Sequence, residues 1–314
     1  MPVKVASEWL NSCSGCEVAI LNLGETLLTV LPHLEFVHIP VLMDHKYFGQ
    51  TGEGDVHHLE IPKATVGIIS GGIRNQEHLE VAQAMRQACD VIIALGTCAT
   101  HGGIPALMNL FDNPALMERY YRTSESTDPH DTPADPVLPP ILDRTYALDE
   151  KIKVDIYLQG CPPHPDLIAE AIVALLEGRE PRLPDKSVCD TCPTIRLGKG
   201  KLQKLHRFTH NAHYDPGKPI SEMHCLLEQG FQCLGPVTRA GCAGFSGEAP
   251  QCIRARVPCQ GCYGPVRKDG NQLLDYLNAL ASNRIDIRSI TDRATVLEFS
   301  GAHGLLQRRR AAGR

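Results

Sequence analysis

Short apolar runs alternate with longer amphipathic ones through the first 180 residues of the chain. Residues 66–70 are typical of a buried strand, and residues 76–88 continue with apolar positions at helical spacing. Two more buried strands are expected at 91–96 and 154–160, followed by a helix at 165–177 that has a proline near its start. Strands of this kind, alternating with helices, favour an α/β fold with a parallel sheet covered on both faces.

The pattern changes near residue 185, where the regular alternation fades and cysteines become dense. A length of 314 residues suits two units better than one core. We therefore expect an α/β domain over 1–184 and a smaller, irregular, cysteine-rich domain over 185–314. Few long apolar runs connect these cysteines, so the second unit is expected to have little core and to be held together by metal centres.

Composition and charge narrow the functional classes. The apolar fraction of 43% and charged fraction of 21% are those of a folded chain, and the net charge of -5 provides no broad basic field for nucleic acid. No run of eighteen apolar residues predicts a membrane span, and the sequence after Met1 shows no charged leader with an apolar signal core. We expect a cytoplasmic protein, in which thirteen cysteines are better interpreted as metal or cluster ligands than as disulfides.

Four cysteines follow expected strands of the first unit: Cys13, Cys16, Cys98 and Cys161. The carboxyl ends of parallel strands share one edge of a sheet, so these thiols are expected to meet there. Gly15 allows a tight turn between the first two, and a helix over 17–31 would direct its positive end toward an anionic group. A lone C-x-x-C also fits a redox dithiol or half of a zinc site, but two further cysteines favour a four-thiolate cluster.

Eight more cysteines lie in the second unit and suffice for two sites of four: Cys189, Cys192, Cys225, Cys233, Cys242, Cys252, Cys259 and Cys262. Their spacing matches neither the compact zinc ribbons and fingers nor the bacterial ferredoxin run, so spacing alone leaves iron-sulfur and structural zinc open. The histidines of this region are expected to be packing or surface residues, because eight thiols already complete two sites: His206, His210, His213 and His224.

The cysteines and the glycines near them lie in short segments: 12–17 (SCSGCE), 96–99 (GTCA), 102–105 (GGIP), 160–163 (GCPP), 233–236 (CLGP) and 258–262 (PCQGC). Taken in order, these segments resemble the signature segments of nickel-iron hydrogenase small subunits. The resemblance runs from residue 3 to about residue 265 and includes Cys225, and the ordered set is far more specific than any single motif.

The resemblance implies a flavodoxin-like first domain that holds a proximal cluster, and a second domain that holds a medial and a distal cluster. By position, the proximal ligands would be Cys13, Cys16, Cys98 and Cys161. The medial ligands would be Cys242, Cys252, Cys259 and Cys262. The distal ligands would be Cys189, Cys192, Cys225 and Cys233. Hydrogen would be split at a nickel-iron centre in a separate large subunit, and this chain would relay single electrons.

Two positions depart from the membrane-linked uptake branch, which has histidine at the position of Cys189 and proline at that of Cys252. Thiols at both positions imply three 4Fe-4S clusters and no three-iron cluster. With the missing twin-arginine leader, they resemble the cytoplasmic methyl-viologen-reducing type; the deazaflavin-reducing and sulfhydrogenase types are close alternatives. The implied partners are a nickel-iron large subunit and, as acceptor, an iron-sulfur adaptor or a heterodisulfide-reductase-like flavin complex, in a larger hetero-oligomer.

Two rival functions remain at this point: an iron-sulfur subunit of a quinone reductase with a related first domain, and a zinc-stabilised interaction module. Glu17 is a candidate proton relay, and equally a surface carboxylate that favours a helix start. Hydroxyls of Thr97 and Ser14 are expected to donate hydrogen bonds to cluster sulfur. Cys89 is expected to be a buried small hydrophobe on a helix. Residues 127–140 are expected to form a surface loop, and residues 273–280 a helix facing either the core or a partner.

Overall fold

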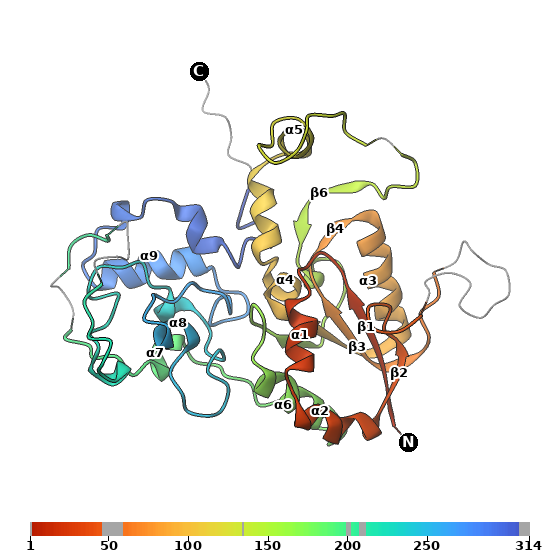
Figure 1. The fold of residues 1–314 in the computed structure, drawn as a ribbon, viewed down its shortest axis with the longest axis horizontal. Helices are drawn as coiled ribbons and strands as arrows, with labels where there is room; N and C mark the ends of the chain where they lie inside the picture. Colours follow the sequence, from red (N-terminus) through yellow and green to blue (C-terminus); the bar gives the residue numbers. More distant parts are fainter. Residues whose placement is uncertain (1, 46–58, 134, 199–201, 207–211, 308–314) are drawn as a thin grey trace.

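A five-stranded parallel sheet organises the first half of the chain (Figure 1). The computed structural model describes residues 2–45, 59–133, 135–198, 202–206 and 212–307. The strands are β1 (Val3–Trp9), β2 (Leu34–His38), β3 (Ala64–Ser70), β5 (Cys89–Leu95) and β7 (Ile156–Leu158), in the order β2-β1-β3-β5-β7. All neighbouring pairs are parallel. This is the flavodoxin-like order, and it confirms the expected α/β class.

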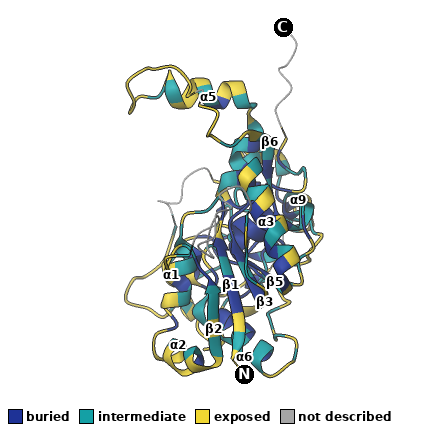
Figure 2. Cartoon of the chain, turned by 90° about the vertical axis from the view of Figure 1, so that its right-hand side faces the viewer, coloured by how far each residue is buried: buried dark blue, intermediate teal, exposed yellow. Residues whose placement is uncertain are grey.

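Helices cover both faces of the sheet (Figures 1 and 2). On one face, α3 (Gln76–Ala88) packs Val81, Ala82 and Met85 into a core with Ile69 and Ile92. On the other face, a second core joins the sheet to α1 (Gly15–Leu21) and α6 (Pro165–Leu176). The strands are buried from both sides, which explains their nearly continuous apolar sequences.

The helix expected over 17–31 is two helices, α1 and α2 (Glu25–Val30), bent by 74° at the break. Gly24 lies between them with φ of 56°, a left-handed conformation that glycine adopts without strain. The amide of Gly24 donates to the carbonyl of Leu21, which closes the first helix. With only seven residues, α1 provides a weaker positive end than the sequence pattern predicts.

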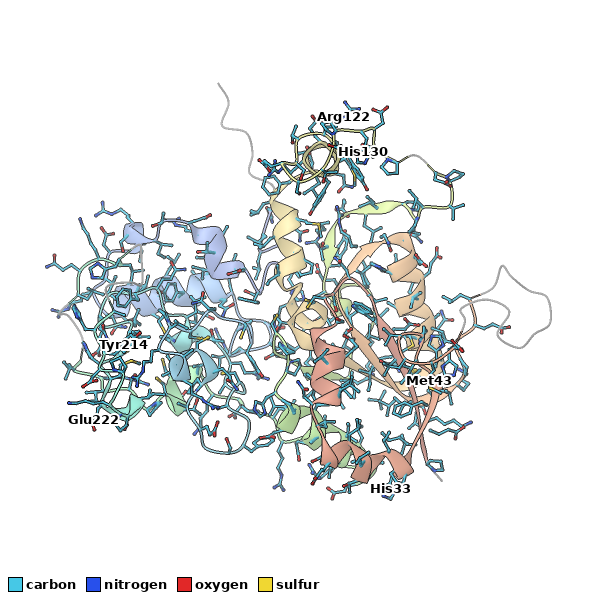
Figure 3. The ribbon with its side chains drawn as sticks, in the orientation of Figure 1. His33, Met43, Arg122, His130, Tyr214 and Glu222 are labelled. Atoms are coloured by element: carbon cyan, nitrogen blue, oxygen red, sulfur yellow. The ribbon has the colours of Figure 1, made fainter. Side chains whose placement is uncertain are left out.

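An arm extends from the first half beyond the sheet. It begins at α4 (Gly96–His101), continues through a 3-10 turn to α5 (Asn113–Tyr121), and returns as β6 (Ile141–Tyr146), which pairs antiparallel with β4 (Ile73–Asn75). Arg122 and His130 lie close together at its end (Figure 3). The described part of 127–140 contains no helix or strand, which confirms the expected loop.

The second half is irregular but has a core of its own. Its helices are α7 (Val188–Thr191), α8 (Gln251–Arg254) and α9 (Gln272–Ser282). Tyr276 and Leu280 of α9 are fully buried beside Leu234 and Val237, so the apolar face of α9 serves the core. The prediction of little core in this unit was wrong, because its apolar residues are scattered in sequence and gather only on folding. Short 3-10 turns complete the chain: Leu31–His33, Ile104–Leu110, Leu148–Glu150, Ile220–Glu222, Gly235–Val237, Ile287–Ser289 and Arg293–Leu297.

The last described residues return to the first unit. The amide of Ala302 donates to the carbonyl of His101 over 3.0 Å, and the His303 ring lies 2.7 Å from the carboxylate of Asp149. A boundary at residue 184 therefore stays a prediction. Within the described residues, no single helix has the length and apolar character to cross a bilayer, although the bent pair Gly15–Leu21 and Glu25–His33 meets those two criteria jointly.

Candidate metal centres

The four cysteines predicted for the first unit come together at the carboxyl edge of the sheet. Cys98 lies in α4 directly after β5, Cys161 follows β7, and Cys16 is the second residue of α1. Burial, with smaller contributions from the neighbouring thiols of Cys161 and Cys13, raises the pKa of Cys98 to about 12. Burial likewise raises the pKa of Cys16, with added contributions from Glu17 and the same thiols. We name this group the proximal quartet.

Two glycines allow sulfur atoms of this quartet to lie close to the backbone. Gly96 has φ of 84°, and a Cβ atom built there would overlap the sulfur of Cys16. A Cβ atom at Gly103, which has φ of 53°, would lie 2.6 Å from the sulfur of Cys98. Gly96 and Gly103 are thus required by conformation and by space, whereas the left-handed residue of the turn between Cys13 and Cys16 is Ser14, with φ of 66°, and not Gly15 as the sequence suggested.

A second quartet, named the distal quartet, consists of Cys189, Cys192, Cys225 and Cys233. Burial raises the pKa of Cys189 to about 12, and Cys233, Cys192 and Cys225 all contribute to that increase. Cys233 is enclosed in the core of the second half, beside Tyr276, where burial raises its pKa to about 12 as well.

The medial quartet consists of Cys242, Cys252, Cys259 and Cys262. Burial, with smaller contributions from Cys242 and Cys252, raises the pKa of Cys262 to about 12. Burial also raises the pKa of Cys259, and Cys233 of the distal quartet and Cys262 and Cys252 of its own quartet contribute to that increase. The thiols that affect one another's pKa values thus include members of the same expected group, with Cys259 also beside Cys233, and the assignment of the twelve thiols to three sites stays a prediction.

The three quartets follow one another through direct contacts. The Thr97 hydroxyl, next to Cys98, donates to the carbonyl of Cys262 over 2.5 Å, and Cys161 raises the pKa of Cys262. At the other end, the amide of Cys259 donates to the sulfur of Cys233 over 3.3 Å. The medial quartet thus touches both of the others.

The donor set fits iron-sulfur clusters. Thiolates are the ligands of 4Fe-4S clusters, and each thiolate binds a different iron atom. Across the described ranges, no three Cys, His, Asp or Glu side chains are arranged to hold one metal ion together. Buried thiols whose pKa values are raised to about 12 lose their protons only when a cation compensates the charge, and bound iron provides that compensation.

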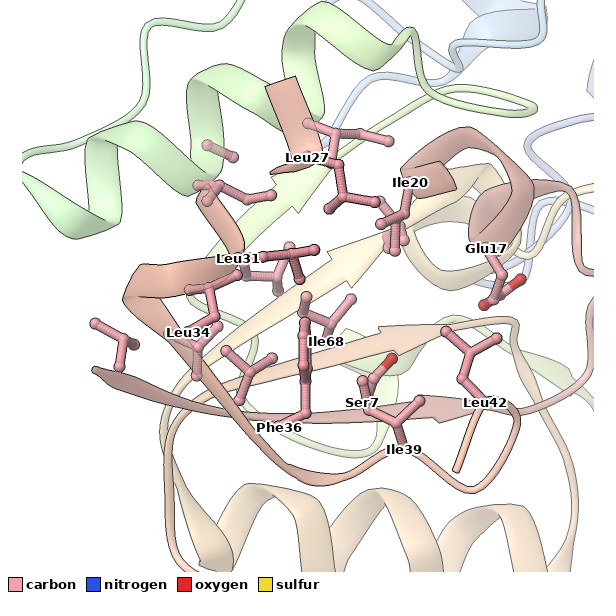
Figure 4. Close-up of a pocket in the computed structure, with 18 of the residues that line it drawn as sticks. Ser7, Glu17, Ile20, Leu27, Leu31, Leu34, Phe36, Ile39, Leu42 and Ile68 are labelled. Atoms are coloured by element: carbon pink, nitrogen blue, oxygen red, sulfur yellow. The ribbon is translucent and has the colours of Figure 1, made fainter. Parts of the chain in front are cut away.

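Glu17 lies between the proximal quartet and an apolar cavity (Figure 4). The Ser70 hydroxyl donates to one carboxylate oxygen, and the other oxygen is buried with no hydrogen-bond partner among the described residues. The cavity, of about 340 Å³, is lined almost entirely by aliphatic side chains of the sheet and of α1, α2 and α6, with Ser7 as its other polar residue. Glu17 is thus more than a surface carboxylate at a helix start.

The hydroxyls of Thr97 and Ser14 are not free to donate to sulfur. Thr97 donates to the Cys262 carbonyl and accepts the Gly160 amide over 3.0 Å, while Ser14 donates to the carbonyl of Cys13 over 2.5 Å. A hydroxyl has one hydrogen, so the expected donation to cluster sulfur is replaced in both cases by a bond to backbone.

Cys89 is buried in the sheet core, as expected, but as the first residue of β5 rather than on a helix. Burial raises the pKa of its thiol to about 11. Of the four histidines expected to pack, His206 lies against Phe231 with ring centroids 5.7 Å apart, and His224 lies 2.9 Å from the Glu228 carboxylate. His213 has its amide bonded to Gln229, and His210 lies outside the described residues.

His101 was not singled out from the sequence. It is buried beside the proximal loop, with its ring 2.8 Å from the Thr100 hydroxyl, and Gly264 packs closely against it from the second unit. Burial, with a smaller contribution from the nearby His303, lowers its pKa from 6.5 to about 3. No local pattern marks this residue, because its burial depends on Gly264 and His303, both distant in sequence.

Comparison with known proteins gives the family. A family model described as NADH ubiquinone oxidoreductase, 20 Kd subunit, matches residues 13–175. A vhu subunit of the F420-non-reducing hydrogenase of Methanocaldococcus jannaschii is 36% identical over 98% of both chains. A chain from a crystal structure of an NAD+-reducing [NiFe]-hydrogenase is 29% identical, with a TM-score of 0.52 over 59% of this chain and 96% of that one.

The chain belongs to the nickel-iron hydrogenase small-subunit family. A further relative, the iron-sulfur subunit of the F420-non-reducing hydrogenase of Archaeoglobus profundus, is 36% identical over 93% of this chain and 91% of its own. This membership makes the chain a subunit of an oxidoreductase complex and sets aside the zinc-stabilised interaction module. The quinone-reductase model ends before Cys189, whereas the hydrogenase relatives also span the cysteine-rich half, which sets aside the second rival.

Proposed function

We propose that this small subunit relays electrons from a hydrogen-splitting centre in a nickel-iron large subunit to an acceptor protein through three 4Fe-4S clusters. Each quartet would hold one cluster, in the order proximal, medial, distal. When bound, the clusters supply reversible one-electron chemistry. The chain itself contributes the positions of the thiols, their burial and the polar contacts between neighbouring quartets.

The observation that carries this proposal is the unbroken succession of the quartets. Thr97 and Cys262 join the first to the second, and Cys259 and Cys233 join the second to the third. Twelve thiols that served separate structural metals would have no reason to lie in groups that contact one another in sequence. A line of contacting sites is the arrangement that electron transfer requires.

Thiols at Cys189 and Cys252 support the cluster type. The pKa effects of Cys189 and Cys252 link each to other cysteines of its expected group, so each proposed site would have four sulfur ligands. Four thiolates are the ordinary ligand set of a 4Fe-4S cluster. We therefore propose three four-iron clusters and no three-iron cluster.

The names of the relatives bear on the type of hydrogenase. The hydrogenases of Methanocaldococcus jannaschii and Archaeoglobus profundus are both named F420-non-reducing, which favours the methyl-viologen-reducing type over the deazaflavin-reducing one. We propose a cytoplasmic hetero-oligomer in which an iron-sulfur adaptor or a heterodisulfide-reductase-like flavin complex receives the electrons. Residues 1–184 would form the proximal domain, and residues 185–314 the domain of the other two clusters.

The test separates hydrogen splitting from electron export. The complex with its large subunit is purified anaerobically with Cys225→Ser, which removes a distal ligand, and hydrogen-deuterium exchange is compared with hydrogen-driven methyl viologen reduction. Exchange should persist while dye reduction falls at least about tenfold, because only export needs the distal site. The control is Cys89→Ala, a buried thiol outside the quartets. Equal dye reduction in both variants would contradict the proposal.

A further inference from the structure

A buried tyrosine of α9 lies next to a cysteine of the distal quartet. The 3-10 turn Gly235–Val237, which follows Cys233 closely in sequence, packs against α7, where Cys189 lies, and against α9, where Tyr276 lies. Tyr276 has no exposed surface, and it shares the core of the second half with Cys233 and Cys259. Its side chain is therefore enclosed at the place where the distal quartet meets the medial one.

The phenol of Tyr276 lacks an acceptor for its hydrogen. Its oxygen is shielded from solvent and has no hydrogen-bond partner among the described residues. A buried hydroxyl without a partner is unfavourable, and native proteins retain few of them. A tyrosine at this position, in place of a phenylalanine, therefore calls for an acceptor that the folded chain alone does not supply.

Cys233 is the polar neighbour of this phenol. Burial and then the charge of the Cys233 thiolate raise the pKa of Tyr276 above its usual value, whereas the Cys233 backbone amide lowers that pKa. A backbone amide acts in this way only at close range, so the phenolic oxygen lies beside the backbone of Cys233. The sulfur of Cys233 is only a few covalent bonds from its amide. The phenol keeps its proton at neutral pH and can therefore donate.

The sulfur of Cys233 already attracts hydrogen-bond donors. The amide of Cys259 donates to it over 3.3 Å, and the amide of Gly235 lowers the pKa of the Cys233 thiol. A protonated thiol is a weak acceptor, whereas an ionised sulfur accepts charge-assisted hydrogen bonds. Once Cys233 is a thiolate ligand, its sulfur becomes the acceptor that the phenol of Tyr276 lacks.

We infer that Tyr276 donates a hydrogen bond to the sulfur of Cys233 when this cysteine ligates a cluster, and that the bond raises the reduction potential of the distal site. Such a bond draws electron density from the ligand sulfur and so favours the reduced, more negative cluster. Cys233 is bonded to Cys259 of the medial quartet, so the bond acts on the side from which electrons arrive. The inference rests on the proposed relay, in which it favours transfer from the medial to the distal site.

Anaerobic redox titration of the whole hydrogenase complex, followed by electron paramagnetic resonance, tests this inference. Tyr276→Phe keeps the ring, so all iron should be retained while one cluster midpoint moves to lower potential. At a fixed potential, the ratio of reduced to oxidised cluster at that site should fall about tenfold, which is about 59 mV for one electron. Cys225→Ser, which removes a distal ligand, identifies the distal signal.

Two control variants separate the hydroxyl from the packing. Leu280→Val trims the same core one turn further along α9, and Tyr120→Phe removes an exposed phenol hydroxyl from α5, so neither should move the midpoint. Loss of distal iron or an unshifted midpoint in Tyr276→Phe, or an equal shift in Leu280→Val, would overturn the role of Tyr276 alone. A wild-type complex with fewer than three reducible clusters in this chain would instead refute the relay.

Discussion

The Thr97 hydroxyl donates to the Cys262 carbonyl over 2.5 Å, and so joins the loop of the proximal quartet to that of the medial one. The same oxygen accepts the amide of Gly160, beside Cys161. One side chain therefore positions three cysteine-bearing loops from two halves of the chain. A threonine that seemed suited to tuning sulfur instead fixes the spacing between two candidate clusters.

Thr97→Val should destabilise the chain by about 2 kcal/mol, because valine leaves the Gly160 amide and the Cys262 carbonyl unpaired in a buried place. Iron content should not change. Anaerobic urea unfolding measures the loss, and Thr97→Ser, which retains the hydroxyl, should recover most of it. Identical midpoints for valine and serine would show that the bond is unimportant.

Gly96→Ala should remove the proximal cluster. Its φ of 84° strains an alanine by about 1–2 kcal/mol, and its new Cβ atom would overlap the Cys16 sulfur. Iron analysis should find about four iron atoms fewer per chain. Gly178→Ala is the matched control, since Gly178 has φ of 68° but open space around it. Full iron content in Gly96→Ala would contradict the close approach.

His101 should make the chain sensitive to acid. Its pKa is lowered from 6.5 to about 3 by burial, so its contribution to stability is complete above pH 6.5 and is lost as the pH falls toward 3. At pH 5 the stability lost through His101 amounts to about 2 kcal/mol. Urea midpoints at pH 8 and pH 5 measure it. His101→Gln should lose less stability between these two pH values than wild type, and the exposed His130→Gln should behave as wild type.

Glu17→Gln tests the proposed proton relay. One carboxylate oxygen of Glu17 is buried with no hydrogen-bond partner among the described residues, and a relay would require this carboxylate to carry a proton, which glutamine cannot do. Hydrogen oxidation should slow by about 10²-fold with all iron retained. The control is Glu25→Gln, an exposed carboxylate in the first turn of α2. Equal rates in the two variants would leave Glu17 a structural residue.

Much of the first unit was predictable because its signals are local. The strand at 66–70 and the helix at 76–88 were found nearly at their observed bounds, since buried parallel strands and amphipathic helices each leave a continuous pattern. The break at Gly24 was missed because apolar spacing continues across it. The short β4 was not recognised, since a strand of three residues carries almost no periodic signal, and its six-residue partner β6 was missed with it.

For the candidate sites as well, some features could be predicted from the sequence and others could not. The twelve thiols were singled out from cysteine count, loop position and family resemblance, and their assignment to three sites of four stays a prediction, which the pKa effects among the thiols support. The contacts between groups were not predictable. The bonds from Thr97 to Cys262 and from Cys259 to Cys233 depend on how the two halves fold onto each other, and the core around Tyr276 depends on residues scattered over a hundred positions.

The central claim is that three groups of four thiols hold three iron-sulfur clusters, and anaerobic metal and sulfide analysis of the purified small subunit within its complex tests it most directly. After subtraction of the metal of the separately analysed large subunit, about twelve iron and twelve sulfide per chain, with no zinc, are expected. Zinc in place of iron, or iron for a single cluster only, would contradict the account.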